Sequence, residues 1–165
     1  MSNLPVQWMA QQSQFGRSLC LILDSKAAPR IHQSLLHQLT PEHYRSVYRE
    51  TAVSALAVGG PFIFSIDSLN PSSLNELFEG QSVDWGWLAS IENHSIGMLV
   101  KHWRERLLIG KRSQQALYRF HDNRVLARAL AHLPESAYPR ISGAGHQCLL
   151  LAGRALDDSR ESGVG

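Results

Sequence analysis

Cysteine is scarce in this sequence, which has only Cys20 and Cys148 among its 165 residues. A scaffold held together by disulfides needs more cysteines in a shorter chain, so that class of protein is excluded. Each cysteine lies in an apolar run, where a small buried thiol fits well. A disulfide between the two stays an open alternative, but the scarcity favours a reducing compartment.

A large charge of one sign is also missing. The chain has 16 basic and 14 acidic residues, which leave a formal net charge of +2. Proteins that follow the phosphates of nucleic acid carry a concentrated positive surface instead. The overall charge therefore predicts no nucleic acid partner.

Long hydrophobic runs are absent as well. No stretch approaches the length of a membrane-spanning helix, and the first residues lack the basic start and the apolar segment of a signal peptide. We therefore expect a soluble protein with no membrane partner, which stays in the cytoplasm or leaves by a route that needs no signal peptide.

What the sequence does contain is a regular alternation of short apolar runs and amphipathic segments. The apolar runs suit strands that are buried on both faces. Helical stripes of apolar residues follow Pro29, Pro71 and Asp122, and another covers residues 96–107, whereas residues 43–57 show no clear pattern. The expected strands cover residues 18–24, 62–67, 85–90, 115–120 and 147–152.

This alternation predicts a single α/β domain with an open, mostly parallel or mixed sheet and helices on both faces, because each crossover between strands contains a helix. With 44% hydrophobic residues, the chain can fill one core. We expect the domain over residues 17–153. Residues 1–16, rich in Gln and Ser, are predicted to be a loosely packed lead-in, and residues 154–165 a flexible tail.

Motifs for catalysis and metal binding are not found. There is no Gly-x-Ser-x-Gly elbow, no His-Glu-x-x-His, no Cys-x-x-Cys and no Gly-rich phosphate loop. His32 and His37 are five residues apart and His94 and His102 eight apart, so neither pair has the spacing that stacks two ligands on a helix. We therefore expect no metal, no cofactor and no enzymatic activity. Asp24, at the end of a buried strand, is the remaining candidate for a small-molecule site, although a carboxylate there more often caps a turn.

Residues 101–124 are locally basic. A solvated helix face explains part of this charge. The functional alternative is a basic surface that meets an acidic partner, where charge complementarity sets the encounter rate and the specificity. The candidate partner-binding residues are Lys101, Arg104, Arg106, Lys111 and Arg112.

Within this region, Arg119, Asp122 and Arg124 lie at a predicted strand-to-helix corner. The carboxylate of Asp122 is placed to cap the following helix, since it can accept from backbone amides of the first turn. Both arginines lie close to it in sequence, so an ion network is plausible. From the residues alone, the simpler interpretation is a corner held by charge.

The segment 117–126, Leu-Tyr-Arg-Phe-His-Asp-Asn-Arg-Val-Leu, resembles the Arg-Phe-Tyr-Asp-Pro-Arg-Val-Leu signature of the type VI secretion effector-chaperone family, also called effector adaptor proteins. The likeness extends along most of the chain, in the family's order. It includes an opening strand that ends at Asp24, a second strand led by Pro61, and a segment from Trp85 to Ser90. Asn123 replaces the family's usual proline at the first helical position, where the exchange should cost little.

The resemblance implies a non-enzymatic adaptor that binds a toxic effector in the producing bacterium and helps to mount it on the spike tip protein. It also implies that Asp24, Arg119, Asp122 and Arg124 are architectural. Two alternatives stay open from the residues: a small-molecule or nucleotide-binding α/β enzyme with a site near Asp24, and an immunity-like protein that binds a toxin.

Overall fold

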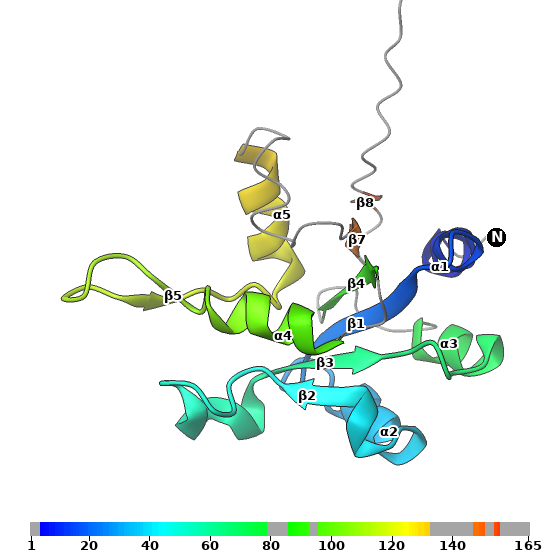
Figure 1. Cartoon of the computed structure of the whole chain (residues 1–165), viewed down its shortest axis with the longest axis horizontal. Coiled ribbons are helices and arrows are strands. Elements are labelled where there is room, and N and C mark those ends of the chain that lie inside the picture. The colour runs from blue at the N-terminus through cyan, green and yellow to red at the C-terminus, as the bar shows by residue number, and fades with distance from the viewer. Residues whose placement is uncertain (1–3, 79–85, 93–95, 133–146, 151–153, 156–165) are drawn as a thin grey trace, which may run out of the picture.

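The computed structural model describes residues 4–78, 86–92, 96–132, 147–150 and 154–155. Its main element is a six-stranded sheet in which every pair of neighbouring strands is antiparallel. The strands follow the order β2-β3-β1-β4-β7-β8 across the sheet (Figure 1). Their bounds are β1 (Ser18–Asp24), β2 (Tyr44–Ser46), β3 (Pro61–Ser65), β4 (Gly86–Ile91), β7 (Gln147–Leu150) and β8 (Arg154–Ala155).

Strand β1 lies inside the sheet and all seven of its residues are buried. Its register places Ile22 beside Ile63 of β3 on one edge and beside Trp87 of β4 on the other. Successive side chains of a strand point to opposite faces. Leu21 therefore contributes to one core and Ile22 to the other.

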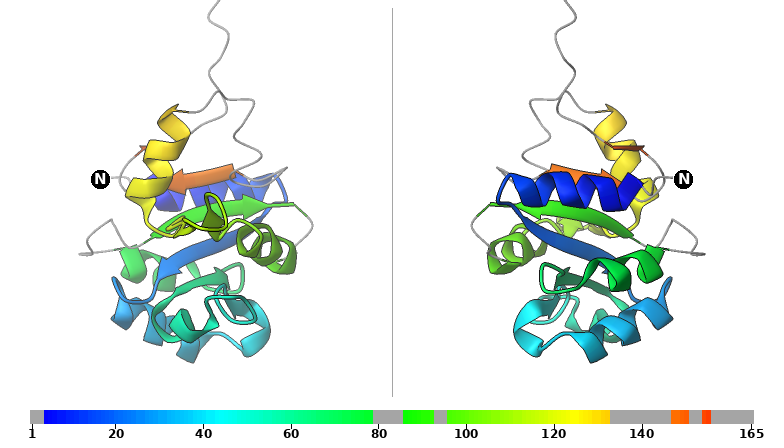
Figure 2. Two further views of the ribbon diagram at one scale, coloured as in Figure 1. Left: turned by 90° about the vertical axis from the view of Figure 1, so that its left-hand side faces the viewer. Right: turned by 90° about the vertical axis from the view of Figure 1, so that its right-hand side faces the viewer.

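Helices cover both faces of the sheet. Helices α1 (Leu4–Gln14), α2 (Pro29–Gln38) and α3 (Pro71–Phe78) pack on the face that includes Leu21, and helices α4 (Ile96–Arg104) and α5 (Asn123–His132) pack on the opposite face (Figures 1 and 2). Short 3-10 helices η1 (Pro41–His43) and η2 (Ser54–Gly59) flank the edge strand β2 in sequence. No helix among these described segments is long and apolar enough to cross a membrane.

The expectation of a mostly parallel or mixed sheet is wrong, because all pairings are antiparallel. The helical crossover through α3 does join two strands that run in the same direction, β3 and β4. Strand β1 lies between them and runs the opposite way, so the two never pair. Helical crossovers are visible in a sequence, but the insertion of a third strand between their ends is not.

The N-terminal segment differs from the expected loose lead-in. It forms helix α1, whose Trp8 and Met9 are buried against the sheet. Gln12 is buried too and accepts a hydrogen bond of 2.7 Å from the Ser90 hydroxyl. Helix α1 has only a narrow apolar side, so a composition rich in Gln and Ser does not reveal its packing against the sheet.

The expected strand over residues 115–120 is also wrong. Only Ala116–Leu117 forms a strand, β6, and it pairs with β5 (Leu108–Ile109) in a separate two-stranded sheet. Gly110 turns this hairpin with a positive φ of 95°. Phe120 leaves the strand and packs in the core against Trp103, with ring centroids 4.3 Å apart.

Cys20 is a free, buried thiol in the core that faces α4 and α5. Burial raises the pKa of Cys20 to about 12. The thiol therefore stays protonated at neutral pH, as the apolar run around it suggested.

Replacing Gly86 with alanine should destabilise the protein by about 2 kcal/mol, a typical penalty for forcing extra volume into a packed interior. The added Cβ would collide with the backbone carbonyl oxygen of Ile22, so β4 could not stay in register with β1. At Gly97 an added Cβ meets open space, and Gly97→Ala should stabilise helix α4 by up to about 1 kcal/mol. Urea unfolding followed by circular dichroism would measure both, and equal stabilities would contradict the close approach of the strands.

Candidate partner-binding site

Asp122 holds the corner formed by the signature segment. It directly precedes helix α5, and its Oδ1 accepts a hydrogen bond of 2.9 Å from the backbone N–H of Arg124, as a helix cap does. The Arg124 guanidinium donates to both carboxylate oxygens, each over 3.0 Å. These side-chain bonds are the main reason that the pKa of Asp122 lies below its usual value. The predicted cap is present, and of the predicted ion network with two arginines the structure shows the pair with Arg124.

Arg119 contributes to this corner through its backbone. Its carbonyl accepts a hydrogen bond of 3.0 Å from the N–H of Asp122, while its side chain is exposed. The next residue, Phe120, accepts a hydrogen bond of 2.9 Å at its carbonyl from the indole N–H of Trp87 on β4. Trp87 thus ties the corner to the sheet, a role that the signature itself does not reveal.

Asp24 lies beside His121, a residue of the signature segment. The Nε2 atom of His121 lies 3.8 Å from Oδ2 of Asp24, and only 7% of the His121 side chain and 12% of the Asp24 side chain are exposed. Oδ1 of Asp24 accepts from the backbone N–H groups of Lys26 and Ala27, over 3.0 and 3.3 Å. Asp24 is therefore a turn cap at the end of β1.

Burial lowers the pKa of His121, and the positive charge of Arg119 lowers it further, against the opposing effect of Asp24. Tyr48 packs edge-on against His121 with ring centroids 6.3 Å apart, and burial raises the pKa of this tyrosine. The neutral imidazole of His121 packs beside the carboxylate of Asp24, and this contact joins the corner to the end of β1.

The other motif positions are also bound into the framework. Pro61 lies directly opposite Asp24 in the β1–β3 pairing. The Ser90 hydroxyl accepts from Nε of Arg17 over 2.8 Å and donates to Gln12. Trp85 lies outside the described residues.

The candidate partner-binding cations divide into two groups. On and after α4, Arg104 donates to the backbone carbonyls of Val47 and Ser46, over 3.1 and 3.0 Å, and Arg106 donates to the carbonyl of His102 over 2.9 Å. Lys101 forms an exposed ion pair with Glu105. Lys111 and Arg112 instead lie, exposed, in the turn between β5 and β6.

The hairpin of β5 and β6, residues 108–117, projects away from the body of the domain (Figure 1). Leu108 and Ile109, adjacent on its first strand, are 39% and 49% exposed. Apolar side chains next to Lys111 and Arg112 on a projecting ribbon are typical of a surface that contacts another protein.

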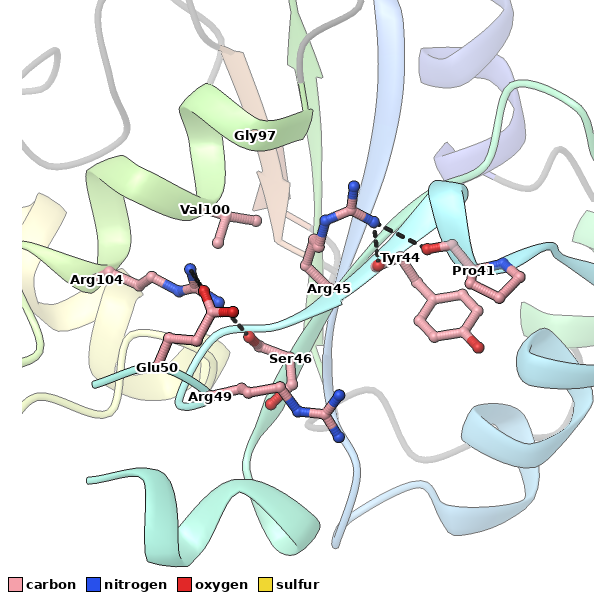
Figure 3. Close-up of a pocket in the computed structure, with 9 residues that line it drawn as sticks. All are labelled: Pro41, Tyr44, Arg45, Ser46, Arg49, Glu50, Gly97, Val100 and Arg104. Carbon is pink, nitrogen blue, oxygen red and sulfur yellow. Dashed lines mark hydrogen bonds and ion pairs between the residues drawn. The ribbon is translucent and has the colours of Figure 1, made fainter. Parts of the chain in front are cut away.

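A second surface feature lies along the outer edge of β2, and we call it the edge groove. It consists of a hollow of about 410 Å³ (Figure 3) and an adjoining hollow of about 380 Å³ that shares Glu50, Gly97 and Arg104 with it. Sequence reasoning identified Arg104 and Lys101 in its lining but missed Arg45 and Arg49. Both lie in the stretch 43–57, where a strand of three residues is too short to give a periodic pattern.

These features define a small α/β domain with an antiparallel sheet, a hydrogen-bonded corner, a projecting hairpin and an edge groove. The chain belongs to the family described as Domain of unknown function (DUF4123), whose model matches residues 19–140. That range includes Asp24, the corner, the hairpin and the edge groove. Searches of the curated proteins and of the solved structures find no match.

Replacing Asp122 with alanine should destabilise the protein by about 1–2 kcal/mol, because α5 loses its cap together with the ion pair. Arg124→Ala is the matched control: it keeps the cap and should cost less than about 1 kcal/mol, since Arg124 is largely exposed. The pKa of Asp122 is lower in the folded protein, so its stabilisation is present above pH about 4 and is lost as pH falls further. Urea unfolding at several pH values measures both effects; equal losses in the two variants would contradict the capping role.

The buried His121 should make the protein less stable at mildly acidic pH. Because its folded pKa is lowered, the unfolded chain binds the extra proton first, and stability falls as pH drops through about 6.5. His121→Gln should flatten the dependence of the melting temperature on pH between neutral and mildly acidic solution. The same exchange at the exposed His37, His37→Gln, is the matched control. An unchanged slope in His121→Gln would show that this imidazole does not titrate as described.

Proposed function

We propose that this chain is a type VI secretion effector adaptor, a non-enzymatic protein that binds a toxic effector in the bacterial cytoplasm and helps to load it onto the spike tip protein. Family membership and the signature in segment 117–126 support this proposal. The main observation behind the proposal is that charged side chains of the signature are bound within the domain. Asp122 and Arg124 bind each other and the start of α5, so they serve to hold a shape.

The hairpin is our candidate for the effector contact. Its strands lie in a separate sheet, so Leu108 and Ile109 can become buried against a partner without any change in the main core. Burying a large apolar side chain contributes about 1.5–3 kcal/mol. The cations Lys111 and Arg112 at the turn would add charge complementarity to an acidic surface.

The alternative of an enzyme with a site near Asp24 is less well supported. Its favourable feature is the pair of shifted groups, His121 and Tyr48, beside a carboxylate. However, Oδ1 of Asp24 already accepts from two backbone amides, and only 12% of the Asp24 side chain and 7% of the His121 side chain are exposed, so the pair offers a substrate little accessible surface. An immunity-like role would use the same binding surfaces, and a toxin neutralisation assay separates it from a chaperone.

The experiment that tests the adaptor role is co-expression with the effector encoded beside this gene. The adaptor hypothesis predicts a complex that survives gel filtration, and loss of secretion of that effector when this gene is deleted. Secretion of an unrelated effector by the same bacterium is the control. If the neighbouring effector is loaded normally in the deletion strain, the proposal is wrong.

A double substitution, Leu108→Ser with Ile109→Ser, should weaken effector binding about tenfold or more, because two apolar anchors are lost from the contact. The loss of stability should be modest, since the two residues are 39% and 49% exposed and lie outside the two core clusters. Leu56→Ser, at an exposed leucine on η2, is the matched control and should bind as the natural protein does. Isothermal titration calorimetry measures the affinities. Unchanged binding by the double variant would show that the effector contacts a surface other than the hairpin.

A further inference from the structure

We propose that the edge groove binds an acidic, extended segment of a protein partner, with guanidinium groups reading carboxylates. The identity of that partner, effector or spike tip protein, rests on the function proposed above. The groove itself is separate from the hairpin and from the signature corner, and its properties follow from the contacts of β2 and α4.

The backbone of the edge strand is already in use. Val47 donates its N–H to the carbonyl of Pro61 on β3 over 3.0 Å, so in the alternating pattern of an antiparallel pair Tyr44 and Ser46 turn their carbonyls outward. Arg45 donates to the Tyr44 carbonyl over 2.8 Å, and Arg104 donates to the Ser46 carbonyl over 3.0 Å. A partner strand could not extend the sheet here without displacing both guanidinium groups.

The same arrangement places positive charge along the groove (Figure 3). Three arginines, Arg45, Arg49 and Arg104, line the main hollow against one carboxylate, Glu50. Glu50 pairs with Arg104 over 3.3 Å. Within the described part of the chain, no carboxylate lies within ion-pair distance of Arg45 or Arg49.

Arg45 is held in place by local backbone bonds. One of its terminal nitrogens, Nη1, donates to the carbonyls of Pro41 and Tyr44, each over 2.8 Å. A guanidinium fixed in this way keeps its remaining donors aimed outward, and a planar fork of donors matches a carboxylate better than any other side chain does. The buried Val100 supplies an apolar floor for the carbon chain of the bound segment.

The mixture of charges favours an acidic peptide over nucleic acid. Glu50 and, in the adjoining hollow, Glu105 stand beside the cations. A phosphate backbone carries negative charge at every step and would be repelled there. A peptide can place its carboxylates at Arg45 and Arg49 and other residues beside the glutamates.

Gly97 allows the groove to be filled without damage to the fold. It lines both hollows, and an added Cβ would meet open space. In the first turn of α4 a glutamate is favourable to the helix, because it opposes the positive helix end. The carboxylate of Gly97→Glu would therefore compete inside the groove with the acidic segment, while the protein stays folded.

The binding experiment uses the full chain with the neighbouring effector and with the spike tip protein, each titrated by calorimetry. Gly97→Glu and Arg49→Glu should each weaken the affinity for one of these proteins about tenfold, and the loss should shrink in high salt. Gly97→Ala and Gly97→Lys are the controls at the same position. Arg30→Glu, on an exposed position of α2, is the control for charge reversal elsewhere. If both partners bind Gly97→Glu and Arg49→Glu as tightly as the natural protein, the inference is wrong.

A second measurement tests the groove proposal independently of the proposed adaptor function. If the natural protein binds neither the effector nor the spike tip protein, the proposed function fails, and a fluorescein-labelled peptide of alternating Glu and Val then tests the groove alone. Saturable binding that Gly97→Glu abolishes supports the groove. Absence of such binding, or stronger binding of a DNA oligonucleotide that is equally sensitive to Gly97→Glu, would overturn it.

Discussion

The burial of strand β1 on both faces and its pairing on both edges are the constraints on which the structure depends. Every residue of β1 is buried, and its alternating side chains supply the centre of two separate cores. Each fully buried Leu or Ile contributes about 1.5–3 kcal/mol, so this strand supplies much of the stabilisation on either side. Its ends set the positions of Asp24, where the corner attaches, and of Arg17, which binds Ser90.

The corner and the edge groove use charged groups in opposite ways. At the corner, Asp122 is buried and both of its carboxylate oxygens accept from the Arg124 guanidinium, so its charge is paired within the domain. Along β2, Arg45 is fixed by carbonyl groups, which carry no net charge, so its positive charge is not neutralised. A cation that is held in place but not paired with an anion among the described residues, such as Arg45, can recognise a carboxylate of a partner. A paired group such as Asp122 instead holds the shape of the protein.

Much of the local structure could be predicted from the sequence. The apolar run at residues 18–24 coincides with β1, and the run at 62–67 overlaps β3. The predicted cap at Asp122 is also present, because a cap depends only on neighbours in the chain. Strand direction could not be predicted, since it depends on the insertion of β1 between β3 and β4, a choice made by distant segments.

The binding surfaces were predicted less well than the framework, for a related reason. A basic stretch is visible at residues 101–124, but the sequence does not reveal that Arg104 reaches across to Val47 and Ser46. Arg45 and Arg49 gain their importance only because β2 lies at the edge of the sheet beside α4. Residues that become neighbours through folding leave no local periodicity to detect.

The capped edge of β2 has a further consequence for the life of the protein in a crowded cell. Open sheet edges are the usual starting points for aggregation, since copies of one chain can pair strand to strand. With arginines on the outward carbonyls of Tyr44 and Ser46, this edge resists self-association. The side chains that we assign to recognition thereby also keep newly made copies apart.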